Sequence, residues 1–239
     1  MTGRVFITGD KHGSMRMFFD IAEKGLAAPE DTVIIAGDTG YIRDHEYPLK
    51  LLTLQRLFPG MVCFIDGNHD NHVILNSLPV CEWNGGRAHR LADRVYHLMR
   101  GEIFDIGGRN VFTMGGARTV ENNYEGEEGV DFWPGEEPTA EELHAAEEKL
   151  LSNIGRIDYV ISHEAPLEAR NSIPRFKKLD GDYVLPAVLQ SWYDRLSESP
   201  DFKKWYFGHM HTDQEIGQKL RCVYNNLVDL DSGLAIRWH

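Results

Sequence analysis

Short runs of consecutive apolar residues alternate with stretches of helical spacing along the first third of the chain. Three of these runs, Val5–Thr8, Thr32–Ala36 and Met61–Ile65, have the pattern of strands that are buried on both faces. The segments between them, Met15–Lys24 and Leu49–Phe58, carry apolar residues at helical spacing. Strands that alternate with helices predict a largely parallel sheet, and such sheets gather their ligands at the carboxyl ends of the strands.

The middle of the chain has a different pattern. Three short apolar segments, Val95–Met99, Glu102–Ile106 and Asn110–Met114, are separated by glycine-containing turns, which predicts an antiparallel meander. The segment from Glu121 to Pro138 is polar and contains two prolines, so we expect a long excursion loop there.

A helix is expected directly after this excursion. Thr139 and Glu142 have the spacing of a capping box, and the helix should continue to about Leu151 with Leu143 and Ala146 facing inward.

The last third returns to the strand pattern. Ile157–Ser162 and Lys204–Phe207 are predicted strands, a helix is expected around Tyr183–Leu196, and the remainder to Trp238 predicts closing antiparallel strands. We therefore expect one α/β domain over residues 1–239, with an excursion or cap at about residues 117–156.

Composition and charge narrow the classes of function. Hydrophobic residues make up 42% of the 239 positions and charged residues 26%, as in ordinary globular proteins. No apolar run approaches the roughly 20 residues of a membrane span, so no membrane partner is predicted. The net charge of −12 disfavours extended nucleic acid as a partner. Three widely spaced cysteines, and a start without a secretory signal, predict a cytoplasmic protein.

Five of the predicted strands end in a turn that carries histidine, aspartate or asparagine. Oxygen and imidazole ligands together suit divalent metals such as Mn, Fe, Zn or Co. Taken singly, each turn favours an ordinary structural role, but a structural role gives no reason for five buried strands to end in the same chemistry. The turns contain Asp10-Lys11-His12, Gly37-Asp38, Gly67-Asn68-His69-Asp70, Ser162-His163 and Gly208-His209-Met210-His211.

This order of motifs resembles the calcineurin-like metallophosphoesterase superfamily, whose pattern is D-x-H, GD, GNH(D/E), H and GHxH. The resemblance implies two packed mixed β-sheets flanked by α-helices. It also implies two divalent metal ions, with manganese as the first expectation and iron, zinc or cobalt as alternatives. The implied ligands are Asp10, His12 and His211 for one ion, Asn68, His163 and His209 for the other, and Asp38 as the bridge between them.

The resemblance further implies that a hydroxide bridging the two ions attacks a phosphate ester. His69 would contact the phosphate and protonate the leaving group. Protein serine/threonine phosphatases of the superfamily extend the second motif to GDxxDRG, and Tyr41 stands where their histidine-orienting aspartate would be. This difference disfavours a protein phosphatase and leaves Asp70 and Asp44 as the candidates for orienting His69.

Loops around the motifs should select the substrate, because the metal ligands are shared by the whole superfamily. Asn68, Arg43, Arg118 and Arg170 are candidate substrate-binding residues. The arginines could clamp a second phosphate or a ribose, with ordinary surface ion pairs as the alternative for each of them. Phe132 and Trp133 could stack on a base, although packing of the excursion is the favoured interpretation.

The sequence as a whole predicts a hydrolase of a small phosphomonoester or phosphodiester, such as a nucleotide. A protein phosphatase, a nuclease or an inactive metal-binding module are the alternatives.

Overall fold

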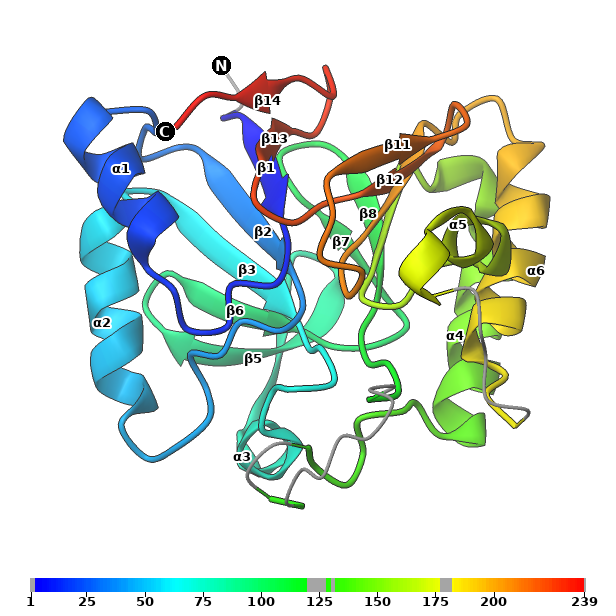
Figure 1. Cartoon of the computed structure of the whole chain (residues 1–239), viewed down its shortest axis with the longest axis horizontal. Coiled ribbons are helices and arrows are strands. Elements are labelled where there is room, and N and C mark those ends of the chain that lie inside the picture. Colours follow the sequence, from blue (N-terminus) through cyan, green and yellow to red (C-terminus); the bar gives the residue numbers. More distant parts are fainter. Residues whose placement is uncertain (1–2, 120–127, 130–131, 177–181, 239) are drawn as a thin grey trace.

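Two β-sheets pack face to face, and helices cover their outer faces (Figure 1). The computed structural model describes residues 3–119, 128–129, 132–176 and 182–238. Apolar side chains from both sheets, among them Ile34 and Cys63 from one and Val111 and Ile161 from the other, fill the space between the sheets. This is the α/β architecture of two packed mixed sheets that the motif pattern implies, so that expectation is confirmed.

The first sheet has eight strands in the order β14-β13-β1-β2-β3-β6-β5-β4. Strands β1, β2, β3 and β6 are parallel neighbours, whereas β4, β5, β13 and β14 are antiparallel to the strands beside them. The strands are β1 (Val5–Thr8), β2 (Thr32–Ala36), β3 (Met61–Ile65), β4 (Val80–Trp83), β5 (Gly86–Ala92), β6 (Val95–Leu98), β13 (Leu227–Asp229) and β14 (Ala235–Ile236).

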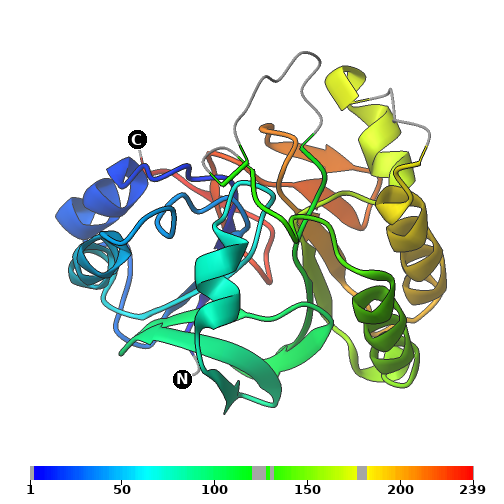
Figure 2. The same ribbon diagram turned by 90° about the horizontal axis from the view of Figure 1, so that it is seen from below.

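Helices α1 (Arg16–Lys24) and α2 (Tyr47–Leu57) cover the outer face of this sheet (Figure 2). Phe18 and Ile21 of α1 and Leu54 of α2 are buried in one cluster with Val33 and Ile35 of β2. The short helix α3 (His72–Ser77) follows the turn after β3, and Asn71 caps it by accepting a hydrogen bond from the amide of Ile74.

The second sheet has six strands in the order β11-β12-β10-β9-β8-β7. Strands β8, β9, β10 and β12 are parallel neighbours, and antiparallel strands close both edges. The strands are β7 (Glu102–Asp105), β8 (Asn110–Met114), β9 (Tyr159–Ser162), β10 (Lys204–Phe207), β11 (Gln214–Ile216) and β12 (Leu220–Cys222).

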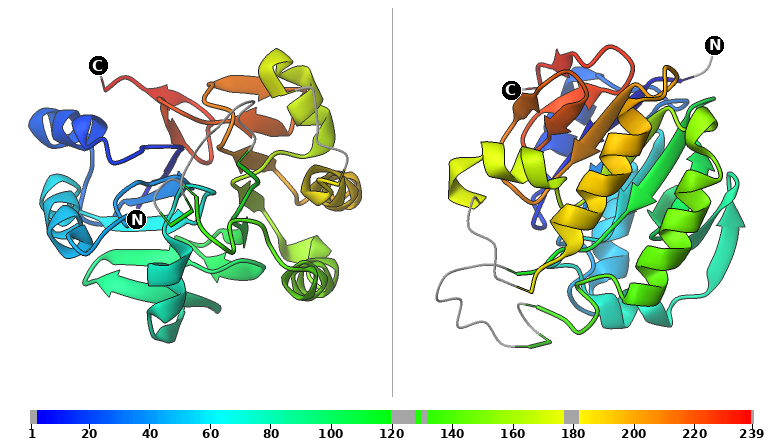
Figure 3. Two further views of the ribbon diagram at one scale, coloured as in Figure 1. Left: turned by 60° about the horizontal axis from the view of Figure 1, so that its bottom comes forward. Right: turned by 90° about the vertical axis from the view of Figure 1, so that its right-hand side faces the viewer.

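Helices α4 (Ala140–Leu151) and α6 (Leu185–Ser197) lie over the outer face of the second sheet, and α5 (Leu167–Ser172) lies beside them (Figure 3). Two short 3₁₀ turns, Ile154–Arg156 and Pro174–Phe176, complete the helical elements. The capping box at Thr139 and Glu142 is present in both directions, and Ala146 of α4 is buried as predicted. Among the helices that the structure describes, none is long and apolar enough to cross a membrane.

The predicted antiparallel meander in the middle of the chain is wrong in one respect. Strand β6 belongs to the first sheet, where it lies parallel to β3, whereas β7 and β8 form an antiparallel pair in the second sheet. Gly101, at a φ of 67°, occurs in the turn between β6 and β7, where the chain passes from one sheet to the other. Strands β4 and β5, which the hydrophobic pattern did not predict, form a hairpin whose turn consists of Asn84 and Gly85.

Candidate metal centre

The motif turns lie at the carboxyl ends of β1, β2 and β3 in the first sheet and of β9 and β10 in the second. Backbone hydrogen bonds join neighbouring turns, since the amide of Asp10 donates to the carbonyl of Gly37 (3.2 Å) and the amide of His12 donates to that of Asp38 (2.9 Å). Glycine permits these close approaches: a Cβ atom on Gly37 would lie 2.2 Å from Nδ1 of His163.

The backbone of these turns is unusual for residues that are not glycine. Among the described residues, six non-glycine residues have positive φ, and five of them belong to the motifs: Asp10, His12, Asp38, His209 and His211. Each such conformation costs about 1–3 kcal/mol and persists only where surrounding structure enforces it. The concentration of strain at one place therefore indicates a functional site.

A first group of donor atoms comes from the turns after β1, β2 and β10. Asp10, His12, Asp38 and His211 each offer one atom, and these atoms all lie within 4.8 Å of one another. The Nε2 atoms of His12 and His211 are 2.9 Å apart, and Nε2 of His211 is 3.5 Å from Oδ1 of Asp10. Two imidazole nitrogens and two carboxylates directed at one point are a donor set that fits a divalent cation.

A second group shares Asp38 with the first. Asp38, His163 and His209 offer donor atoms within the same 4.8 Å limit and all three are buried. The Nε2 atom of His163 lies 3.4 Å from Oδ2 of Asp38 and 3.0 Å from Oδ1 of Asn68. Its Nδ1 must donate to the carbonyl oxygen of Ala36 at 2.8 Å, which leaves Nε2 as the atom that can bind a metal.

The electrostatics of these side chains fit a bound cation. Burial raises the pKa of Asp10 to about 8, with a further contribution from Asp38 and an opposing one from His163. Burial disfavours the charged form of His163, but the neighbouring Asp38 carboxylate outweighs that effect and raises the pKa of His163 to about 10. A proton on His163 thus partly neutralises the Asp38 carboxylate, and a bound divalent ion would take over this role and displace the proton. The donor set and its charge both fit a pair of divalent metal ions.

Comparison with known proteins agrees with this geometry. The family model of the calcineurin-like phosphoesterases matches residues 3–213. The chain belongs to this family. The crystal structure of TT1561 of Thermus thermophilus is similar, with a TM-score of 0.53 at 10% identity over 99% of this chain and 98% of that chain, which shows the shared fold. No curated protein sequence matches the chain.

His69 of this calcineurin-like phosphoesterase lies at the edge of the first donor group. Its backbone amide donates to Oδ1 of Asp38 at 2.8 Å, and its ring centroid is 5.7 Å from that of His12 in an edge-to-face arrangement. The structure therefore places the predicted proton donor next to the donor groups.

Asp70 joins two of the motif turns. It is fully buried, its Oδ1 accepts from Oγ1 of Thr39 at 2.8 Å, and its Oδ2 accepts from the amide of Gly67 at 2.9 Å. The other candidate for orienting His69, Asp44, has a half-exposed carboxylate that pairs with Lys50 at 3.1 Å. Tyr41, at the position that departs from the protein phosphatases, is buried and donates to the carbonyl of Ser14 at 2.8 Å.

The three predicted substrate-binding arginines differ in their surroundings. Arg43 is exposed on the turn after β2. Arg118 contacts Glu137 and Asp182 at 2.6 Å each, and its guanidinium carbon lies 4.8 Å from the centre of the Tyr183 ring. Arg170 is fully buried and pairs with Glu164 at 2.7 Å. Phosphate binding by any of the three stays a prediction.

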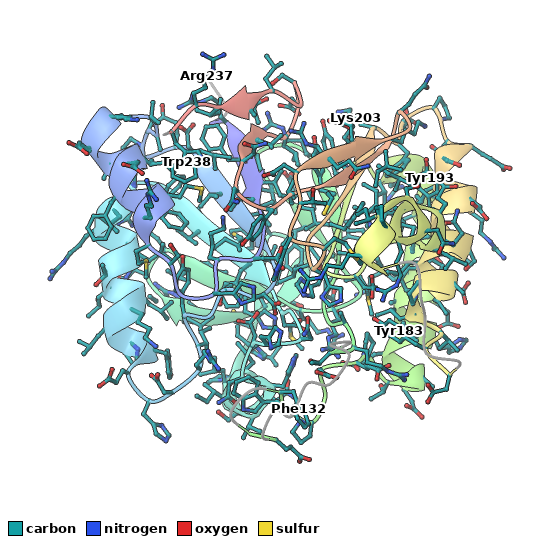
Figure 4. All side chains as sticks on the ribbon, viewed as in Figure 1. Phe132, Tyr183, Tyr193, Lys203, Arg237 and Trp238 are labelled. Atoms are coloured by element: carbon teal, nitrogen blue, oxygen red, sulfur yellow. The ribbon has the colours of Figure 1, made fainter. Side chains whose placement is uncertain are left out.

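The excursion that was expected over Glu121–Pro138 lies partly outside the described residues. Trp133 is buried, which agrees with its expected packing role. Phe132 lies at the same end of the molecule as α3 (Figure 4).

Sequence reasoning did not single out Glu164, although it directly follows the motif residue His163. The carboxylate of Glu164 is fully buried, accepts from Arg170 and from the hydroxyl of Tyr183 at 2.7 Å each, and lies 3.8 Å from Nε2 of His209. A charged residue directly after a strand-end histidine was the available signal. Carboxylates beside metal-binding histidines orient the ring and raise its basicity.

Proposed function

We propose that this protein is a binuclear metal-dependent hydrolase of small phosphomonoesters or phosphodiesters, such as nucleotides. The observation that carries the proposal is the pair of donor groups that share Asp38, in a chain of the calcineurin-like phosphoesterase family. Two divalent ions, manganese in the first place and iron, zinc or cobalt as alternatives, would supply Lewis-acid activation of the phosphate and of the attacking water.

The chain's own residues would hold these ions in fixed positions. Asp10, His12 and His211 are the proposed ligands of one ion, and Asp38 is the ligand common to both. Asn68, His163 and His209 are the proposed ligands of the other ion. The carbonyl of Ala36 fixes the ring of His163, so this ligand needs no reorganisation when a cation binds.

His69 is the proposed general acid. Its backbone is fixed by the hydrogen bond to Asp38, and its ring lies beside His12 at the edge of the donor groups, where a leaving oxygen would depart. Asp70 supports this arrangement by joining the turns that carry Thr39 and Gly67 rather than by reacting.

A small substrate is favoured by the charge of the chain. A net charge of −12 repels extended polyanions, whereas a single phosphate group can be bound where metal ions reverse the local field. Among the arginines, Arg43 is our first candidate for a substrate contact, because it is exposed on a motif turn, whereas Arg118 is half-buried and Arg170 is fully buried. Three free cysteines, two of them buried, support a cytoplasmic location.

The test is hydrolysis of p-nitrophenyl phosphate and bis-p-nitrophenyl phosphate by metal-stripped protein, with Mn²⁺, Fe²⁺, Zn²⁺ or Co²⁺ added back. We expect metal-restored turnover that falls by about 10²–10³-fold or more in Asp38→Asn. His69→Asn should bind two ions and still lose most turnover on a poor leaving group.

The ratio of the two substrates separates monoesterase from diesterase activity. Stoichiometric binding of two ions without turnover of either ester, or of nucleotide substrates, would contradict the enzymatic proposal and favour an inactive metal-binding module.

A further inference from the structure

The side chain of Asn68 is held by hydrogen bonds that lead out of the metal centre. Its Oδ1 faces Nε2 of His163 at 3.0 Å, and its Nδ2 donates to Oγ1 of Thr119 at 3.0 Å. Thr119 in turn makes two hydrogen bonds to Glu136, from its hydroxyl to Oε2 (2.6 Å) and from its amide to Oε1 (3.1 Å). These four residues come from four separate places in the sequence.

The direction of this chain of hydrogen bonds follows from the chemistry of its members. An ionised carboxylate only accepts, so the single hydroxyl proton of Thr119 is committed to Glu136. The hydroxyl oxygen must then accept from Asn68, and the group of Asn68 that faces Thr119 must be its NH₂. The carbonyl oxygen of Asn68 is thereby directed to the second donor group, and this assignment does not depend on distinguishing oxygen from nitrogen in the amide.

Glu136 is itself fixed to the frame of the protein. Its carbonyl oxygen accepts from the amide of Ala117 at 3.1 Å and from Nη2 of Arg100 at 3.2 Å, and Arg100 pairs with the buried Asp66. The backbone of Glu136 is thus fixed, and its carboxylate accepts from both the amide and the hydroxyl of Thr119. Glu136 can therefore hold the Thr119 side chain in one rotamer, which is what positioning of Asn68 requires.

We infer that Thr119 and Glu136 are positioning residues that present the carbonyl oxygen of Asn68 to the second metal ion. The inference rests on the proposed function, because the orientation of Asn68 matters for a cation only if one binds there. Without the Thr119 hydroxyl, the amide can rotate by half a turn and present two N–H groups to the cation. Loss of such a supporting contact typically weakens metal affinity by about 10–100-fold.

The experiment compares Thr119→Val, which keeps the shape of the side chain, with Thr119→Ser, which keeps the hydroxyl. Metal-stripped proteins are titrated with Mn²⁺ in a calorimeter, and their melting temperatures are measured without metal. We expect Thr119→Val to weaken the second of two binding events by about 10–100-fold while the first changes little, and Thr119→Ser to restore the second event.

Two further variants complete the design. Glu136→Gln should weaken the same binding event, since an amide at this position can donate to Thr119 and reverse the hydrogen bond to Asn68. Thr53→Val is the matched control, because Thr53 lies on the exposed face of α2 and its hydroxyl donates to the carbonyl of Leu49 in the same helix.

The outcomes separate the two proposals. If the wild-type protein binds two Mn²⁺ ions and Thr119→Val binds both with unchanged affinity, the positioning role is wrong and the proposed function stands. A lower melting temperature of Thr119→Val with unchanged Mn²⁺ affinity would likewise reduce Thr119 to a structural role. If the wild-type protein binds no second ion, the proposed binuclear function itself fails.

Discussion

Two clusters of histidine and aspartate, one fully or largely buried and one with exposed histidines at His12 and His211, contact the turn at Gly67–Asp70. One is the candidate metal centre, and the other, which we call the Asp66 cluster, consists of Asp66, His72, His89, His97 and Arg100. In the Asp66 cluster the polar atoms bind one another. Arg100 donates to Oδ2 of Asp66 at 2.8 Å, Nε2 of His97 is 3.1 Å from Oδ1 of Asp66, and the Nδ1 atoms of His89 and His97 are 3.0 Å apart.

The buried carboxylates of the two clusters have opposite pKa shifts. Burial acts to raise the pKa of Asp66, but Arg100 together with His97 and His72 outweighs it and holds the pKa of Asp66 well below its usual range. Burial raises the pKa of Asp10 in the candidate metal centre to about 8, and the charged group that opposes this shift most is a histidine, His163. The same residue types therefore form a closed protein network on one side of the turn and a site that a cation would complete on the other.

The largest expected effect tests whether the Asp66 cluster is structural. Asp66→Asn removes the anion that pairs with Arg100 in a buried position, so the free energy of unfolding should fall by about 3–5 kcal/mol while the folded protein still binds two Mn²⁺ ions. Denaturant unfolding and Mn²⁺ titration measure the two quantities. The control is Asp93→Asn, whose carboxylate is 91% exposed beside Arg90 and whose loss should cost less than about 1 kcal/mol.

Equal, small losses of stability in both variants would contradict the structural role of Asp66. Loss of Mn²⁺ binding in folded Asp66→Asn would show that the Asp66 cluster contributes to the metal site and is not purely structural.

The next effect compares one histidine from each cluster. His163→Ala removes a proposed ligand, and Mn²⁺ affinity should fall by more than the roughly 100-fold (about 2.7 kcal/mol) that loss of a supporting residue typically costs. His97→Ala should lower stability but leave Mn²⁺ affinity within about threefold, since His97 contacts Asp66 and His89. Calorimetric titration of both variants decides the matter, and equal losses of affinity would show that our separation of the clusters is wrong.

The parts of the fold that could be predicted from sequence are those with local signals. The buried runs of β1, β2 and β3 end at their motif turns, so their parallel order and the approach of Asp10 to Asp38 followed from the pattern. The β4–β5 hairpin also carried a local signal, Asn84-Gly85, that sequence reasoning did not use. No local signal indicates that β6 belongs to the first sheet, because the strand with which it pairs, β3, is distant in the sequence.

The residues that support the site were not predictable for the same reason. Thr119 is 51 positions from Asn68 and 17 from Glu136, and no spacing rule relates them. Arg170 was a candidate phosphate clamp because a guanidinium binds phosphate through two hydrogen bonds, whereas in the structure it is buried and pairs with Glu164. Sequence motifs identify atoms that can bind a metal, but the residues that orient those atoms can be identified only from the folded structure.

The smallest expected effect concerns proton binding by the Asp66 cluster. Burial lowers the pKa of His89 to about 4, and the neighbouring His97 adds to this shift. The unfolded chain, with an ordinary histidine pKa of about 6.5, therefore binds a proton first as the pH falls, and the stability that neutral His89 provides above pH 6.5 is lost between about pH 6.5 and pH 4. Because His89 lines a pocket together with Asp66 and His97, solvent screening reduces the expected loss to about 1–2 kcal/mol.

Unfolding free energies measured from pH 7.5 to pH 4.5 check this expectation in His89→Gln, which cannot take up a proton. The wild-type protein should lose about 1–2 kcal/mol more than His89→Gln over that interval, whereas His144→Gln, at an exposed position of α4, should follow the wild-type curve. Parallel curves for wild type and His89→Gln would mean that the cluster accepts a proton without cost. A cluster that accepts a proton so readily could also bind a cation. The Asp66 cluster and the metal centre would then differ only in the geometry of their donor atoms and not in their charge.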